Sequence, residues 1–186
     1  VGVEQPGDIT VPGRKLVDIF RALPDGVSVT LSTEGERAIV RAGRSRFTLA
    51  TLPATEFPVV EEINASQVGA VPQGEFQRLI DKTHFSMAQQ DVRYYLNGLL
   101  LEVDAKTLRT VATDGHRLAL CQIALDQGGA VAGTPLQVIV PRKGVLELQR
   151  LLSGDGAVEL AIGSNHVRIQ IGDIRFTSKL IDGRFP

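Results

Sequence analysis

The sequence has one cysteine, no tryptophan and only two tyrosines among its 186 residues. A lone cysteine, Cys121, cannot close an internal disulfide bond. The chain also shows neither a charged-then-apolar leader nor an apolar run of about 18 residues, the length that a membrane-spanning helix needs. We therefore expect a protein of the reducing cytoplasm without membrane association.

The sequence has no excess of positive charge either, since 20 Lys and Arg stand against 21 Asp and Glu. This balance excludes nucleic-acid binding on the strength of net charge alone, although locally clustered arginines can still contact phosphates. Hydrophobic residues make up 43% of the chain, enough for a packed core. We expect a soluble globular protein in which any DNA contact comes from geometry or from local patches.

Motifs for catalysis and metal binding are also missing. No Gly-rich phosphate loop follows a strand-like run, no nucleophile lies in a sharp elbow, and the three histidines lack ligand spacing. An imidazole beside a carboxylate suits proton transfer, so Asp114 and His116 keep a hydrolase open as the rival interpretation. We expect no catalytic residue, no metal and no cofactor.

An internal repeat is present. Residues 9–23 match residues 138–152 in pattern, with Pro12 and Pro141 lying 129 positions apart, and the run Arg-Phe-Thr recurs at 46–48 and 175–177 with the same spacing. A weaker third copy opens at Val71-Pro72. A repeat of this kind predicts one structural unit used three times.

Each repeat predicts a short amphipathic helix followed by strands. The Val-Pro pair suits a first helical turn, where the missing N–H of proline has no cost. Apolar residues follow at helical spacing, and β-branched or alternating runs separated by Gly, Asn or Asp come next. The helical apolar residues are Leu16, Ile19, Phe20 and Leu23, then Phe76, Leu79 and Ile80, and then Val145, Leu148, Leu151 and Leu152. The predicted fold class is α+β, built from units of one helix and roughly three strands.

Units of about 60 to 70 residues are marginal alone, because one helix on a small open sheet leaves an apolar face and strand edges exposed. We therefore expect two units per domain. Units two and three would form a domain over residues 63–186, and residues 1–62 would be the second half of a truncated domain, joined by the polar link 61–66. Because the chain starts at Val1 and stops at Pro186, we expect it to be a piece of a longer protein.

The polar faces of the three predicted helices carry basic residues. An ordinary solvated face is one interpretation, and a scaffold that presents several such helices to a phosphate backbone is the other. The residues are Arg14, Lys15 and Arg21 in the first helix, Arg78 and Lys82 in the second, and Arg142, Lys143 and Arg150 in the third.

The polar cluster at residues 113–117 interrupts two apolar runs where a plain hairpin turn would have sufficed. With Leu96 delivered by a neighbouring strand and Leu118 following, it would form a shallow apolar groove with polar edges, suited to a short peptide. A polar turn with Arg117 covering the core accounts for the same residues, and the pattern alone does not decide between the two.

Four runs, at residues 85–98, 108–118, 138–144 and 176–180, closely resemble the bacterial DNA polymerase III β subunit, the sliding clamp family. The resemblance covers essentially the entire chain. It implies the DNA clamp fold, with two repeat units per domain, three domains per subunit and two subunits per ring. By the same resemblance, residues 1–62 are the second half of the first domain and residues 63–186 most of the middle one.

The resemblance also implies partners and sites. The family encircles duplex DNA without sequence preference and holds the polymerase α subunit, the clamp loader and other proteins that carry a clamp-binding motif. The implied peptide pocket consists of Leu96, Thr113, Gly115, His116, Arg117, Leu118 and Pro186. The implied DNA-facing residues are Arg14, Arg21, Arg78, Lys82, Gln89, Gln90, Tyr94, Tyr95, Arg142, Lys143 and Arg150.

The head-to-tail dimer surface implied by the resemblance consists of Lys15, Ile19, Leu23, Arg37, Arg44, Arg46, Phe47 and Leu49. It faces an acidic third domain of the neighbouring subunit, which accounts for the arginines between residues 36 and 47. A ring needs both surfaces of such an interface. We therefore expect a homodimeric ring for the full-length protein but not for this chain.

Overall fold

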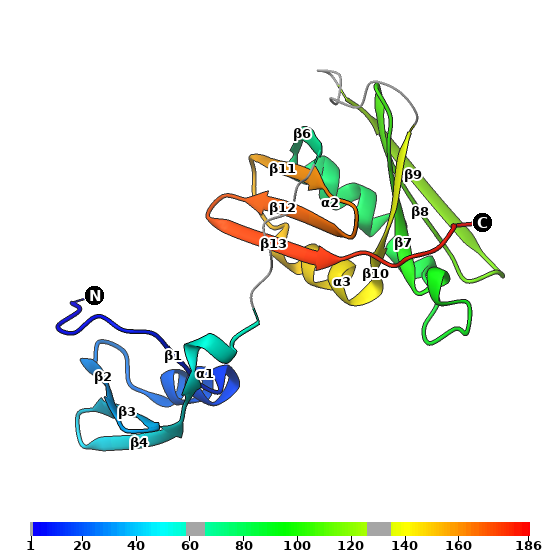
Figure 1. The fold of residues 1–186 in the computed structure, drawn as a ribbon. Helices are drawn as coiled ribbons and strands as arrows, with labels where there is room; N and C mark the ends of the chain where they lie inside the picture. Colours follow the sequence, from blue (N-terminus) through cyan, green and yellow to red (C-terminus); the bar gives the residue numbers. More distant parts are fainter. Residues whose placement is uncertain (1, 59–65, 126–134) are drawn as a thin grey trace. The chain divides into compact units, whose positions relative to one another are not determined.

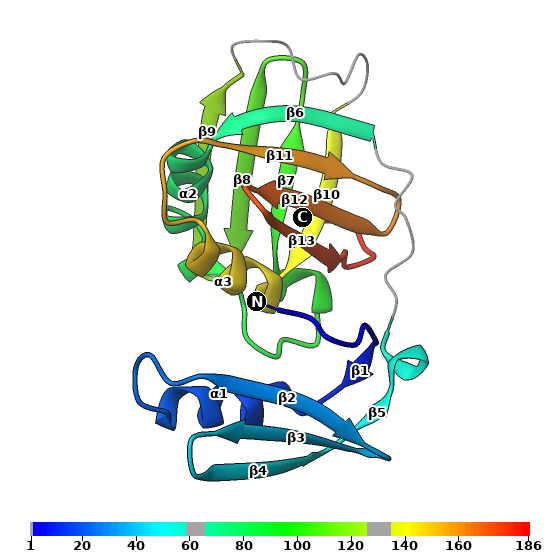
Figure 2. The same ribbon diagram turned by 90° about the vertical axis from the view of Figure 1, so that its left-hand side faces the viewer.

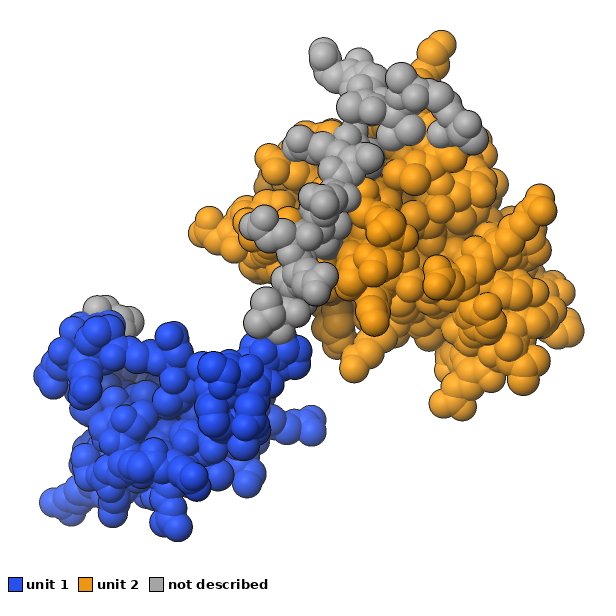
Figure 3. All heavy atoms as spheres, viewed as in Figure 1, with its two compact units in different colours: residues 1–60 blue, residues 61–186 orange. Residues whose placement is uncertain are grey.

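The structure, a computed structural model, describes residues 2–58, 66–125 and 135–186. It divides into two compact units, Val1–Val60 and Glu61–Pro186 (Figure 3). The expected boundary between residues 62 and 63, and all of the expected link 61–66 except Ser66, lie outside the described residues. Each unit is therefore described by itself.

The described residues of the first unit form one α-helix, a three-stranded antiparallel sheet, a short strand pair and one 3-10 helix. The sheet has the order β2-β3-β4, and β1 pairs only with β5 among the described strands. The elements are β1 (Ile9–Thr10), α1 (Gly13–Ala22), β2 (Val29–Glu34), β3 (Arg37–Ala42), β4 (Ser45–Ala50), β5 (Leu52–Pro53) and the 3-10 helix η1 (Ala54–Glu56).

The core of the first unit is small. Ala38, Val40 and Leu49 are buried, and Leu16 and Ile19 of α1 pack on them from one side. No residue of α1 is fully buried, and Phe20 leaves 48% of its surface exposed. The predicted apolar face of this helix is thus only half covered by the described residues of its own unit.

The second unit contains the other two repeats (Figures 1 and 2). The first of them comprises β6 (Ser66–Pro72), α2 (Gln73–Asp81), the 3-10 helices η2 (His84–Ser86) and η3 (Tyr94–Leu96), β7 (Gly98–Val103), β8 (Thr107–Thr113) and β9 (Leu118–Ala124). The other comprises β10 (Leu136–Pro141), α3 (Arg142–Leu151), β11 (Ala157–Ile162), β12 (His166–Ile171) and β13 (Ile174–Lys179).

The two repeats exchange their first strands. The sheet orders are β10-β7-β8-β9 and β13-β12-β11-β6, so β10 joins the sheet of the preceding repeat while β6 joins the sheet of the following one. Val140 lies opposite Leu99, and Leu160 lies opposite Gly69. Periodicity predicted the three strands after each helix, but it gave no sign of the exchanged strand before it.

Proline precedes each helix one position earlier than predicted. Pro72 and Pro141 are the N-cap residues of α2 and α3, with the extended backbone of the last strand residue rather than that of a first helical turn. Strand and helix therefore follow each other without a loop, because proline accepts the extended conformation and its missing N–H leaves no sheet bond unmade.

The apolar faces of α2 and α3 meet in one core. Phe76, Leu79, Val145 and Leu148 are buried as predicted, among the inner residues of both sheets. The two helices lie side by side (Figure 2), where the Gln149 side-chain amide donates to Asp81 over 2.7 Å. Two repeats thus build one domain with two sheets and one helix pair, the arrangement that the fold class predicted.

Candidate functional site

The hairpin turn between β8 and β9, residues 113–117, is shaped by its own side chains. The Thr113 hydroxyl donates to the Arg117 carbonyl over 2.7 Å and accepts the Gly115 N–H over 3.1 Å. Gly115 has φ +87°, a left-handed conformation that glycine adopts at little cost. The cluster is therefore a closed turn whose exposed side holds Gly115, His116 and Arg117.

Asp114 caps this turn. Its Oδ1 accepts the backbone N–H groups of His116 and Arg117 at 2.9 and 3.0 Å, and its Oδ2 meets Arg117 Nε at 3.1 Å. Bonds from backbone N–H groups to the ionised carboxylate lower the pKa of Asp114. The carboxylate is thus bonded to the turn backbone and to Arg117, so the structure does not show the Asp–His pair that a hydrolase would need.

Arg117 also ties the turn to η2. Its Nη2 donates to the Phe85 carbonyl over 2.6 Å, yet 59% of its side chain remains exposed. Leu118, the first residue of β9, is 62% exposed. An exposed leucine beside a fixed cation gives the turn both an apolar and a polar contact surface.

The expectation for Leu96 needs correction. It lies at the end of η3 rather than on a strand, and only 2% of its surface is exposed. The 3-10 helix turns Leu96 into the interior, and the Leu96 carbonyl accepts the Ala88 N–H over 3.0 Å. Leu96 therefore belongs to the packed support of this region and presents almost no surface to a ligand.

An apolar strip runs across the outer face of the sheet from the turn to the end of the chain. Leu118 lies opposite Thr113 and Leu120 opposite Val111, so all four side chains share one face. Val111 packs with Leu100 and Ile139, and Phe185 lies against this cluster.

The segment after β13 reaches the strip by crossing β10 and β7 (Figure 1), held where the Ile181 N–H donates to the Ile139 carbonyl over 2.9 Å. Pro186 follows Phe185 and is exposed. The structure brings together Thr113, Gly115, His116, Arg117 and Leu118 in one hairpin, and Phe185, the neighbour of Pro186, packs against Val111 of the same sheet.

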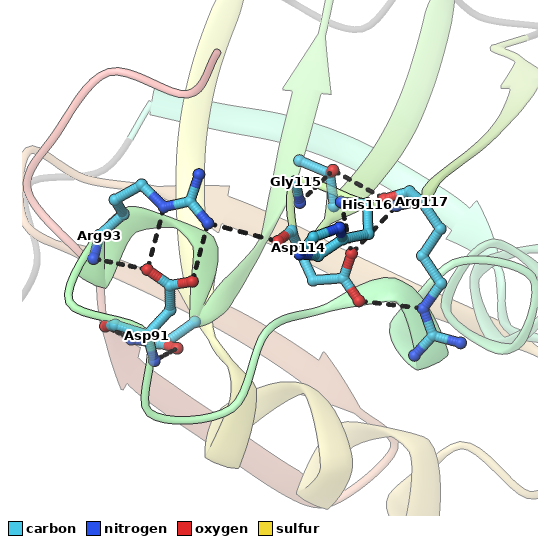
Figure 4. Close-up of polar contacts among 8 residues, drawn as sticks. Asp91, Arg93, Asp114, Gly115, His116 and Arg117 are labelled. Carbon is cyan, nitrogen blue, oxygen red and sulfur yellow. Dashed lines mark hydrogen bonds and ion pairs between the residues drawn. The ribbon is translucent and has the colours of Figure 1, made fainter.

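Asp91 and Arg93 belong to this region, although the sequence did not single them out. Arg93 Nε and Nη2 form a fork with the two Asp91 oxygens at 3.0 and 2.9 Å, and Nη2 also approaches the Asp114 carbonyl at 3.4 Å (Figure 4). The hydrogen bonds from Arg93 lower the pKa of Asp91 to about 2. Two opposite charges two residues apart occur in many loops, so no specific sequence signal marked this pair.

The loop before η3, together with η3 itself, carries the four uncharged residues that were expected to contact DNA. Gln89, Gln90 and Tyr94 are exposed, whereas Tyr95 is half-buried and meets Tyr94 edge-on with ring centroids 6.0 Å apart. Gln90 has φ +56°, a strained conformation for a residue other than glycine. The tight path of the loop thus directs both glutamines outward.

Several basic residues of the helices already form ion pairs or hydrogen bonds within the second unit. Arg78 pairs with Glu75 at 2.7 Å and Arg150 pairs with Glu147 at 3.0 Å, both within one helical turn. Arg142 is half-buried and donates to the Met87 carbonyl over 3.4 Å. Of the basic residues predicted on the three helices, those that are exposed and form no ion pair with a described residue are Lys82 and Lys143 in the second unit and Arg14, Lys15 and Arg21 in the first.

The expected dimer surface falls on α1, β3 and the edge strand β4. Arg37, Arg44 and Arg46 are exposed, and Arg46 pairs with Glu34 at 3.3 Å. Lys15 is exposed as well, while Ile19, Leu23 and Phe47 are half-buried. Leu49 corrects the expectation, because the two-residue strand period turns it inward, where it is 5% exposed in the core.

Among the described residues, no helix is long and apolar enough to cross a membrane.

Comparison with known proteins gives the chain its family. Residues 2–61 match the family model of the DNA polymerase III beta subunit, N-terminal domain, and residues 70–186 match that of the central domain. The chain is 55% identical to the beta sliding clamp of Pseudomonas aeruginosa and 53% identical to that of Escherichia coli K12, covering 98% of this chain and 49% of each relative.

A solved structure of the P. aeruginosa sliding clamp bound to griselimycin superposes with a TM-score of 0.89 at 55% identity, over 98% of this chain and 49% of that one. The chain belongs to the family of the bacterial DNA polymerase III β subunit, the sliding clamps. It spans about half the length of the curated relatives it matches.

Proposed function

We propose that this chain is part of a processivity factor, a non-catalytic accessory subunit that encircles duplex DNA and tethers the replicative polymerase. The observation that carries the proposal is the exposed apolar strip beside a rigid hairpin turn, in a chain of the sliding clamp family. The exposed Leu118 at the start of an ordered strand, next to the fixed Arg117, suits the capture of a short peptide.

The partners at this strip would be the polymerase α subunit, the clamp loader and other proteins with a clamp-binding motif. A solved structure of the P. aeruginosa sliding clamp holds griselimycin, and we propose that this ligand would occupy the strip and so can be used to probe it. The proposed pocket consists of Thr113, Gly115, His116, Arg117, Leu118 and Pro186, with Leu96 as support beneath. The role requires no metal or cofactor, and the proposed compartment is the cytoplasm.

The DNA contact would be electrostatic and independent of sequence. The exposed cations Arg14, Lys82 and Lys143 can meet phosphates, and the exposed Tyr94 offers a ring to a base. Arg78 and Arg150 would first have to leave their carboxylate partners. Such contacts are individually weak, which suits a ring that holds DNA by enclosure and must still slide.

The first unit supports a role in a larger assembly. Its helix α1 lacks a fully buried residue, and β2 pairs only with β3 among the described strands. By analogy with the strand exchange in the second unit, another repeat would cover this open side. The opposite edge, at β4, would form the head-to-tail dimer surface together with Arg37 and Arg44.

Titration with griselimycin, followed by calorimetry, tests the peptide site. We expect the chain to bind it more weakly than an intact clamp subunit, because the chain spans about half the length of its relatives and the rest of the subunit would complete the proposed pocket. His116→Ala and Leu118→Ala should weaken the binding further in both proteins. Equal affinity of the chain and the intact subunit would contradict the proposal that residues outside this chain complete the pocket.

Sedimentation of the chain tests the proposed ring. A head-to-tail ring needs two different surfaces, and this chain carries only the one on α1, β3 and β4. We expect a species that does not close into a ring and does not stay on circular DNA. A closed dimer of this chain would overturn the assignment of the dimer surface.

A further inference from the structure

Two segments that lie about 20 residues apart in the sequence meet through one side chain. The polar loop, residues 89–97, carries the exposed glutamines and both tyrosines, and the hairpin turn, residues 113–117, carries the proposed peptide site. Arg93 contacts both, through the fork on Asp91 and through the bond to the Asp114 carbonyl (Figure 4).

The polar loop is closed on itself. The Asn97 side chain accepts the Asp91 N–H over 2.9 Å and donates to the Asp91 carbonyl over 2.9 Å, and the Arg93 N–H donates to Asp91 Oδ1 over 2.8 Å. These bonds join both ends of the loop to each other. A displacement of Arg93 is therefore passed to the loop as a whole, including Tyr94 and Tyr95.

The Arg93 guanidinium packs against the hairpin turn at Gly115, which has no side chain. A Cβ added to Gly115 would lie 3.1 Å from both terminal nitrogens of the Arg93 guanidinium. The plane of the guanidinium thus occupies the space beside Gly115 that any other residue would fill. A ligand that presses on Gly115 or His116 also presses on Arg93.

We propose that Arg93 is a positioning residue that couples the hairpin turn to the polar loop, so that a ligand bound at the turn shifts the loop that carries the tyrosines. By thermodynamic reciprocity, DNA bound on the loop changes the affinity of the turn for its ligand by the same factor. This inference rests on the proposed function, because it takes the turn as the peptide site.

The coupling depends on the shape of arginine and not only on its charge. A guanidinium holds a carboxylate with two parallel bonds and keeps a further N–H for the Asp114 carbonyl. A lysine ammonium keeps the charge but cannot make the fork. Arg93→Lys therefore separates geometry from charge, and Arg175→Lys, at an exposed arginine of β13 outside this contact, is the matched control.

The protein carries its own reporter for the test, since its only two tyrosines, Tyr94 and Tyr95, lie in the polar loop and it has no tryptophan. Griselimycin is titrated while tyrosine emission is recorded and the signal of the free ligand is subtracted. We expect a saturable change in emission for the wild type and for Arg175→Lys, and none for Arg93→Lys at saturating ligand. Thermal melting confirms that each variant is folded.

A second measurement tests reciprocity. The Kd for griselimycin is determined with and without a saturating short DNA duplex at low salt, and we expect the duplex to change it by about 5-fold or more in the wild type. The same ratio in Arg93→Lys, or a ratio of one in the wild type, would overturn the coupling.

The emission titration also distinguishes the coupling from direct contact and from a failure to bind. If emission changes equally in Arg93→Lys, direct contact of the ligand with Tyr95 is the cause and the coupling is refuted. If griselimycin does not bind the wild type, the proposed peptide site fails first, and the inference fails with it.

Discussion

Leu118→Ala tests the peptide site most directly, because Leu118 contributes little to the fold and much to the exposed strip. Fully burying a leucine side chain is worth about 1.5 to 3 kcal/mol. Since 62% of Leu118 is exposed, a ligand that covers it would gain about 1 to 2 kcal/mol, and the buried remainder contributes about 0.5 to 1 kcal/mol to folding.

Calorimetric titration with griselimycin would read this difference as a loss of affinity of about 5- to 30-fold. Leu120→Ala is the matched control, since Leu120 lies two residues further along the same face of β9 and is 53% exposed, but is not among the proposed pocket residues. We expect its effect to stay within about 2-fold, or roughly 0.4 kcal/mol.

Two outcomes would refute this reasoning. Unchanged affinity in Leu118→Ala, with normal thermal stability, would show that the ligand does not cover this side chain. An equal loss in both variants would place the ligand along the middle of β9 rather than at the hairpin turn.

Three further predictions concern stability. The pKa of Asp91 is lowered to about 2, so the ionised carboxylate stabilises the fold fully above the unfolded pKa near 4, and this stabilisation is lost as the pH falls through about 2. Asp91→Asn should therefore flatten this part of a profile of melting temperature against pH, measured from pH 6 to pH 2. An unchanged profile would contradict the ion pair. Gly115→Ala should cost about 1 kcal/mol in urea unfolding because of the left-handed backbone, and a neutral effect would show that the turn relaxes. Thr110→Val removes a buried 3.0 Å bond to the Leu79 carbonyl and should cost about 1 kcal/mol, whereas the exposed Thr48→Val should be nearly neutral; equal effects would argue against that bond.

The sequence predicted the repeat and the helices well, because both depend on local pattern. The Val-Pro starts and the helical spacing of Phe76, Leu79, Val145 and Leu148 identified the buried faces of α2 and α3. The exchange of β6 and β10 was not predictable in this way. Strand periodicity shows which face of a strand is apolar but not which neighbour it pairs with.

The candidate site was predicted as a set of residues rather than as a contact network. The resemblance gave the hairpin residues, but Leu96 and Leu49 are buried, because a 3-10 helix and a two-residue strand period direct them inward. Arg93 was missed since its role depends on Gly115, which lies about 20 residues away and acts by having no side chain. A single sequence does not show that the space left by a missing side chain is filled by a residue far away in the chain.

The exchange of β6 and β10 has a consequence for how the second unit can be divided. Neither repeat completes its own sheet. The sheet of each repeat lacks one strand, and the other repeat supplies that strand. Two polypeptides covering residues 66–125 and 135–186 should therefore complement each other in trans. Fused to separate partners, they would form a split reporter that regains its fold only when the partners bring them together.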